Sequence, residues 1–208
     1  MREFIYYSKN AVTRGSKIGD DLMKAGRLDI ACQIIIQAFF VSHHMRPNVN
    51  LHLIFDGPPT PPRHLELFPG ISGSSKFGDA EDKIDISKKD IGSLIKKMLY
   101  KYKEGKRNEI APGYWIEKKS FSNLISEMVS EGKEIFVLDK RGSELREVKI
   151  PENAVFVLGD QDGIPKKEMK KIKHLDIGKI SVGPQMLFAS QAVTILQNEL
   201  DRRDVGKV

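Results

Sequence analysis

Hydrophobic and polar residues recur along the chain in short patterns that predict alternating strands and helices. Aromatic and β-branched residues at 3–7 indicate a first strand. The polar segment 8–27, which contains three glycines, is expected to be a long loop, and loops of that length usually carry function. A broad apolar face over 29–44 then predicts a helix that is buried on most sides.

The middle of the chain continues this alternation. Apolar residues alternate over 50–56 and predict a strand that ends at Asp56-Gly57. The PPTPP segment at 58–62 has few backbone donors and is expected to be a rigid extended loop. The stretch 70–78 has the composition of a phosphate-binding loop but not its spacing, so we expect a flexible loop there.

Two amphipathic helices and a short strand are expected next. Residues 87–90 resemble the N-cap of a helix that ends near Gly105, and Ser120 resembles the N-cap of a helix that stops at Gly132. Between the two helices, 106–113 is expected to be a turn and 114–116 a short strand.

The last third of the chain alternates most clearly. Strands are expected at 134–138, 154–158 and 179–182, with a hairpin partner for the first at 145–150. Segments that follow Gly159 and Gly183 have helical patterns. The sequence therefore predicts one α/β domain over 1–208, with a mostly parallel sheet that is covered by helices on both faces.

Composition narrows the class of protein. The formal charge of +6 and the sequence pI of about 9.2 suit a polyanionic partner without requiring one. No apolar run reaches the roughly 18 residues needed to cross a bilayer, and the first residues lack the apolar core of a signal peptide. The single cysteine, Cys32, agrees with a reducing compartment, so we expect a cytoplasmic protein.

Several kinds of catalytic site are not indicated. His43 and His44 are adjacent on the expected helix and diverge, whereas His52, His64 and His174 show no ligand spacing, so no metal is predicted. No G-x-G-x-x-G follows the first strand, which argues against a nicotinamide-dependent oxidoreductase. The strand ends near 138, 159 and 182–187 instead suit a flat purine that backbone groups contact.

The order of motifs in the last third resembles the SPOUT class of S-adenosylmethionine-dependent RNA methyltransferases. A strand, GDQDG, a helix, a strand, SVGP and a long helix that ends in LDR carry the resemblance. MREF, GRLD, AFFVSHHMR, GPPTPP and SVGPQMLFASQ are similar to the archaeal branch that methylates N1 of pseudouridine in the T-loop of tRNA, at position 54. A related enzyme for ribosomal RNA or ribose 2′-hydroxyls, or a non-catalytic knotted RNA-binding dimer, stays open as an alternative.

This resemblance implies a C-terminal trefoil knot, with the knot and cofactor region at about 134–203, a homodimer, tRNA as partner and S-adenosylmethionine as cofactor. The family's cofactor contacts fall on Leu138, Gly159, Val182, Gly183, Pro184, Gln185, Met186, Leu187 and Ala192. Many members carry histidine at the positions of Gln161 and Gln191 and cysteine at Ala192, so the role of those side chains is not carried over.

Methyl transfer from a sulfonium needs alignment and removal of one weakly acidic proton, and it needs no metal. Asp56 and Arg27 are the catalytic candidates, and Arg27, Asp29 and Arg63 are the candidate RNA contacts. Each also has a structural interpretation, since Asp29 can begin a helix, Arg27 can pair with Asp29 and Asp56 can cap a turn.

Overall fold

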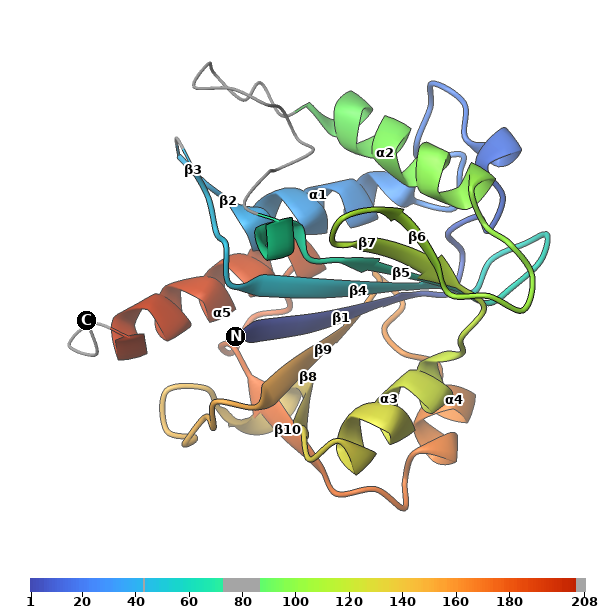
Figure 1. The fold of residues 1–208 in the computed structure, drawn as a ribbon. Coiled ribbons are helices and arrows are strands. Elements are labelled where there is room, and N and C mark those ends of the chain that lie inside the picture. The colour runs from blue at the N-terminus through green and yellow to red at the C-terminus, as the bar shows by residue number, and fades with distance from the viewer. Residues whose placement is uncertain (43, 73–86, 205–208) are drawn as a thin grey trace.

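A computed structural model describes residues 1–42, 44–72 and 87–204 and contains a single large sheet (Figure 1). Its eight strands are β1 (Arg2–Ser8), β4 (Val49–Phe55), β5 (Arg63–Leu67), β6 (Asn108–Ala111), β7 (Tyr114–Glu117), β8 (Glu134–Glu144), β9 (Ala154–Gly159) and β10 (Ile177–Ser181). In space the order is β10-β8-β9-β1-β4-β5-β7-β6. The strands from β10 to β4 pair in parallel, and β5, β7 and β6 extend the sheet in antiparallel pairs.

Helices cover both faces, as the sequence predicted. On one face lie α1 (Leu28–Phe39), α2 (Lys88–Tyr100) and α5 (Ala189–Asp204), and on the other lie α3 (Phe121–Ser130) and α4 (Lys166–Lys171) (Figure 1). Successive residues of β1 divide between the two layers, so Phe4 and Tyr6 pack in the α1 layer and Ile5 and Tyr7 in the α3 layer. The fully buried β1 is the centre of the fold.

The predicted helix caps are confirmed. The Ser87 side chain accepts a hydrogen bond from the Asp90 backbone N–H, and Asp90 reciprocates in a capping box that begins α2. Ser120 accepts from the Asn123 backbone N–H in the same way and begins α3. The helix α2 ends at Tyr100, earlier than expected.

Several predicted boundaries were wrong. The helix expected through His44 ends at Phe39, and the short strands β2 (Phe40–Val41) and β3 (His44–Met45) follow it. Ser42 has φ +46, which a continuing right-handed helix excludes. The segment 70–78 begins in a short 3-10 helix, Pro69–Ser72, and its remainder lies outside the described residues.

The hairpin expected at 145–150 is absent from the described structure. Instead β8 continues to Glu144 and pairs in parallel with β10, which forms the edge of the sheet. The pairing jumps from Lys179–Val137 to Ile180–Ser143, so 138–142 bulge out of the ladder. The turn-like composition of this segment therefore marks a bulge, not a reversal of the chain.

The helices α1 and α5 pack side by side and run in the same direction (Figure 1). The Thr194 hydroxyl donates to Gln37 Oε1 (2.9 Å), and the Gln197 side-chain amide donates to the Ala38 carbonyl (2.8 Å). Because α1 returns antiparallel to β1, both helices begin at the edge where the parallel strands end.

The far end of α5 is held to β1 by an ion-pair cluster. The buried Arg2 guanidinium contacts Asp201 (2.7 Å) and Asp204 (2.9 Å), and Arg46 forms a two-point bond with Asp201 at 2.6 Å. The hydrogen bond from Arg46, followed by those from Arg2, lowers the pKa of Asp201.

We expect Asp201→Asn to lower the melting temperature by about 2–4 °C at pH 7. Because the pKa of Asp201 is lowered in the folded state, its stabilisation is present above the unfolded pKa of about 3.9 and is lost as pH falls through the folded value. Thermal denaturation followed by circular dichroism should give a difference in melting temperature between parent and variant that is constant from about pH 5 to 8. This difference should decrease to zero in acid. A difference that widens in acid would contradict this role.

Candidate functional site

The candidate site lies at the edge where β9, β1 and β4 end and where α1 and α5 begin (Figure 1). Ligand clefts of open α/β sheets form outside this edge. The first turn of a helix presents unpaired N–H groups and a partial positive charge, which favour an anion. Two such helix starts side by side suit a phosphate-bearing substrate.

Arg27 and Asp29 form the charged pair at the start of α1. Arg27 Nε and Nη2 donate to the two Asp29 oxygens at 3.0 and 3.1 Å. The Asp29 carboxylate raises the pKa of Arg27 through these bonds and through its charge. Arg27 has φ +63, an uncommon left-handed conformation for a residue other than glycine, and such strain is often found at functional sites.

Asp56 directly follows β4, but its side chain lies on the other face of the sheet edge. The Tyr7 hydroxyl donates to Asp56 Oδ2 at 2.9 Å, and the Tyr7 ring packs edge-on against Phe121 of α3. Burial, followed by this hydrogen bond to Asp56, raises the pKa of Tyr7. The structure thus does not bring Asp56 into contact with the Arg27–Asp29 pair on the α1 face.

Arg63 begins β5 and is buried, with only 6% of its surface exposed. Its guanidinium donates to the Pro62 carbonyl (2.8 Å) and to Thr60 Oγ1 (3.0 Å), and it stacks 3.6 Å from the Tyr102 ring centroid. Burial lowers the pKa of Arg63, and among described residues no carboxylate forms an ion pair with it. In this conformation Arg63 fixes the proline-rich loop.

Asp160 holds the turn after β9 to the end of β1. It was not among the predicted site residues. Its carboxylate accepts from the backbone N–H of Lys9 (3.0 Å) and of Asp162 (3.0 Å). Burial raises the pKa of Asp160. A Cβ at Gly159 would lie 2.5 Å from the Gly163 carbonyl carbon, so only glycine fits this close turn. The GDxxG spacing was the available signal for this role.

The loop 182–187 connects β10 to α5 and is shaped by Ser181. The Ser181 hydroxyl accepts from the Gly183 N–H (3.2 Å) and donates to the Gly183 carbonyl (3.0 Å). Pro184, Gln185 and Met186 are exposed, and Val182 and Leu187 are half-buried. Most predicted cofactor contacts therefore lie on one accessible loop beside the start of α5.

The positions that depart from the resembled family have other partners here. The Gln191 side chain accepts a hydrogen bond from the Phe188 N–H (3.0 Å) and so caps the start of α5. Ala192 is buried in the first turn of α5, and Gln161 is exposed in the turn after β9. Leu138, a further predicted contact, is half-buried where β8 begins to bulge.

A cavity of about 260 Å³ lies on one side of this loop. Val182, Gly183 and Pro184 line it together with residues of α5 and of the segment 144–146, but Leu138, Gly159, Leu187 and Ala192 do not. The volume is just below the range of about 300–1,000 Å³ of small-molecule sites. Three of the nine predicted cofactor positions thus line this cavity, and the other six do not.

Apolar side chains and an open glycine nevertheless fit an adenosyl group. Gly183 has φ +138, and a Cβ placed there would meet nothing within 4 Å, so the loop leaves free space at this point. Val182, Leu187 and Leu138 are half-buried apolar residues, and the backbone of the loop 182–187 offers N–H and C=O groups for polar contacts.

Comparisons with known proteins agree with this architecture. A structure described as Archaeoglobus fulgidus Nep1 bound to S-adenosylhomocysteine aligns with a TM-score of 0.58 over 98% of this chain and 99% of that one, at 9% sequence identity. This likeness shows a shared fold.

Sequence relatives match the whole chain. A Methanocaldococcus jannaschii protein named tRNA (pseudouridine(54)-N(1))-methyltransferase is 31% identical and covers 100% of both chains. A Methanococcus maripaludis (strain C6) protein of the same name is 35% identical and covers 97% of this chain and 99% of its own. A family model described as "Putative SAM-dependent RNA methyltransferase" matches residues 1–205. The chain therefore belongs to this family of S-adenosylmethionine-dependent RNA methyltransferases, which it shares with these tRNA pseudouridine methyltransferases.

Proposed function

We propose that the protein methylates N1 of pseudouridine 54 in the T-loop of tRNA, with S-adenosylmethionine as methyl donor. The observation that carries the proposal is the full-length similarity to relatives that are named for this reaction. The paired helix starts and the Arg27–Asp29 pair beside the loop 182–187 supply an anion-binding edge where such a substrate can be aligned.

The reaction is a displacement at carbon. S-adenosylmethionine, when bound, would supply an activated methyl group, and base N1 would bond to that carbon as the carbon–sulfur bond breaks. The loop 182–187 positions the donor, and Arg27 holds a phosphate or the base carbonyl in line with it. The base loses its N1 proton in the process, so an acceptor must lie nearby.

Asp56 is our candidate to accept that proton. Tyr7 bonds to Oδ2, whereas Oδ1 forms no hydrogen bond with the described residues. We expect Asp56→Asn to reduce turnover about 10-fold, a modest loss because water can also accept a weakly acidic proton. Tyr7→Phe is the matched control, since it keeps the Asp56 carboxylate and removes only the hydroxyl that donates to it. Unchanged turnover in Asp56→Asn would exclude Asp56 as the acceptor. A loss in Asp29→Asn would not by itself assign that role to Asp29, because Asp29 also orients Arg27.

The proposal also includes a C-terminal trefoil knot, a homodimer and a cytoplasmic location. Met186 of the loop 182–187 and Phe188, which follows this loop, expose 77% and 72% of their surfaces. A second copy of the chain that covers them would remove this apolar area from water. A formal net charge of +6 suits a tRNA partner, and one buried thiol suits a reducing compartment. No helix of the described ranges is long and apolar enough to span a membrane.

The test uses matched T-arm RNAs that carry uridine or pseudouridine at position 54. Each RNA is incubated with protein and S-adenosylmethionine and then analysed by nucleoside mass spectrometry. We expect one methyl group on the base of pseudouridine only. A methyl group on uridine or on ribose would refute the substrate assignment, and no methyl group on any RNA despite cofactor binding would favour a non-catalytic RNA-binding protein.

A further inference from the structure

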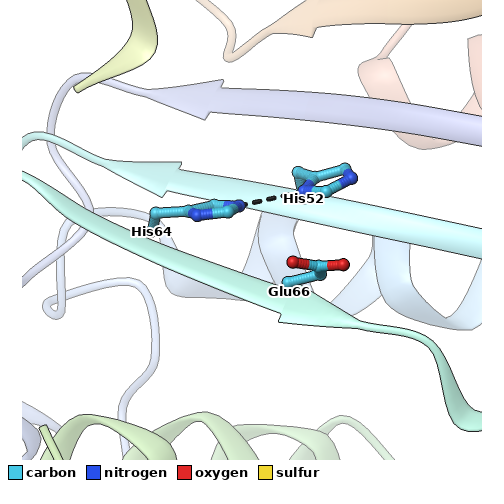
Figure 2. Close-up of side chains that lie close together, drawn as sticks. All are labelled: His52, His64 and Glu66. Carbon is cyan, nitrogen blue, oxygen red and sulfur yellow. Dashed lines mark hydrogen bonds between the residues drawn. The ribbon is translucent and has the colours of Figure 1, made fainter. Parts of the chain in front are cut away.

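A second cluster of reactive side chains lies in the sheet, away from the cofactor loop. His52 of β4 and His64 of β5 are 3% and 2% exposed, and their Nδ1 and Nε2 atoms lie 2.9 Å apart (Figure 2). One ligand atom of each, together with a Glu66 carboxylate oxygen, falls within 4.8 Å of the others. The sequence suggested no relation between these histidines, because β5 was not predicted.

The sheet brings the three side chains together. His52 pairs with Glu66 across the antiparallel ladder of β4 and β5, and His64 stands two residues from Glu66 on the same face. Both rings are therefore held by central strands instead of loops. A site on such rigid elements is positioned more precisely than a site on loops.

The outer nitrogens of both rings already have carboxylate partners. His52 Nε2 lies 3.1 Å from Glu3 Oε1, and His64 Nδ1 lies 3.0 Å from Glu117 Oε1. Lys133 contacts Glu3 (2.6 Å) and Lys119 contacts Glu117 (2.9 Å), which favours the ionised form of both carboxylates. Each ring therefore donates its outer N–H to an acidic neighbour.

The two rings together have one N–H proton too few for the three contacts that they make, and the contact between the rings is the one left without a proton. Two neutral imidazoles carry two N–H groups, but the row from Glu3 to Glu117 contains three close contacts. When the outer two contacts use both N–H groups, Nδ1 of His52 and Nε2 of His64 face each other with lone pairs. That arrangement is repulsive unless a cation binds both nitrogens.

We propose that His52 Nδ1, His64 Nε2 and Glu66 bind a divalent transition-metal ion of the zinc class. Two imidazoles and one carboxylate are a common donor set for zinc. Metal-bound histidines usually donate their other N–H to a carboxylate, which is the role that Glu3 and Glu117 have here. Glu66 is itself oriented by Asn50 (3.2 Å) and Arg107 (2.6 Å).

The two rings must reorient to admit the ion. Two nitrogens of a tetrahedral zinc site are separated by about 3.3 Å, so these nitrogens must move apart by roughly 0.4 Å. The ring planes are within 16° of parallel and the centroids are 5.1 Å apart, so the nitrogens point at each other and both rings must tilt before their lone pairs meet at one ion. The ion would link β4 to β5, the junction between the parallel strands and the antiparallel extension. Its role would be to hold this junction together, independently of methyl transfer.

The experiment begins with full-length protein that has been treated with a chelator and dialysed. Zinc is titrated by calorimetry, and bound metal is counted by mass spectrometry after gel filtration. We expect one ion per chain and a melting temperature that rises with zinc. Cobalt(II) provides a readout that needs no variant, because four-coordinate nitrogen and oxygen ligation gives strong visible absorption that octahedral cobalt lacks.

Variants then assign the ligands. We expect Glu66→Gln and His64→Gln each to weaken zinc binding at least about 100-fold, and Glu3→Gln to weaken it about 10–100-fold through the orientation of His52. His174→Gln changes an exposed histidine outside the cluster and should bind zinc like the parent. Circular dichroism of each metal-free variant shows whether it is folded before zinc is added.

Two outcomes overturn the proposal. In the first, Glu66→Gln and His64→Gln bind zinc as tightly as the parent, which would place the ion elsewhere. In the second, the folded parent binds neither zinc nor cobalt at one equivalent, and nitrogen-15 spectra show a doubly protonated imidazole, so that the cation between the rings is a proton.

Discussion

Gly183→Val should weaken binding of S-adenosylmethionine at least about 100-fold, which corresponds to about 2.7 kcal/mol. Gly183 has φ +138, a conformation that β-branched residues hardly adopt, so the loop 182–187 must change shape. The Ser181 hydroxyl contacts both the N–H and the carbonyl of Gly183, and these bonds would be disturbed as well. Calorimetry with S-adenosylmethionine and its demethylated product measures the loss.

The matched control is Gly105→Val. Gly105 also has a positive φ (+70), and a Cβ added there would likewise meet nothing within 4 Å, but it lies in the turn after α2, remote in sequence from the cofactor loop. Both variants should lose some stability from backbone strain, and only Gly183→Val should lose cofactor affinity. Unchanged affinity in Gly183→Val would mean that the loop does not form the cofactor slot.

The parallel half of the sheet was predictable from sequence because its strands are buried on both faces. Runs such as 154–158 are almost wholly apolar, and the helices between them have clear apolar stripes and serine caps. Their order predicts which strand ends meet at one edge. The position of Arg27 and of the loop 182–187 at that edge followed from this pattern and from the family resemblance.

In the antiparallel extension the strand expected at 114–116 is confirmed as β7, but β5 and β6 were missed for a physical reason. In β5 the residues that alternate with Leu65 and Leu67 are His64 and Glu66. His64 is buried by its contacts with β4 and β7, and Glu66 is half-buried. Local sequence does not reveal such partners, because they lie on other strands. The same limitation hid β6 within a turn-like segment and hid the proximity of His52 and His64.

The sequence also did not predict on which face of the sheet the side chains at the strand ends lie. Asp56 and Arg27 both sit at strand-end positions, yet Asp56 turns toward Tyr7 in the α3 layer while Arg27 begins α1 on the opposite face. One extra residue at a strand end reverses the face, since side chains alternate with a period of two. Tests of the two residues must therefore be independent.

Arg27→Ala should reduce turnover of pseudouridine-containing RNA roughly 100- to 1,000-fold and leave cofactor affinity intact. Losses of this size follow removal of one pre-organised donor from an active site. The guanidinium is oriented by its two bonds to Asp29, and 40% of the side chain remains exposed toward solvent, so it can also meet a phosphate or a base carbonyl. Single-turnover methylation together with cofactor calorimetry separates these two effects.

Arg27→Gly separates the side chain from its strained backbone. Alanine in the left-handed region costs about 1 kcal/mol, whereas glycine adopts φ +63 without strain, so Arg27→Gly should melt at a higher temperature than Arg27→Ala. If the guanidinium acts on the RNA, both variants lose turnover equally despite their different stabilities. Arg27→Lys keeps the charge but not the two-point geometry and should recover only part of the rate. Turnover that follows stability across the three variants would instead assign Arg27 a purely structural role at the start of α1.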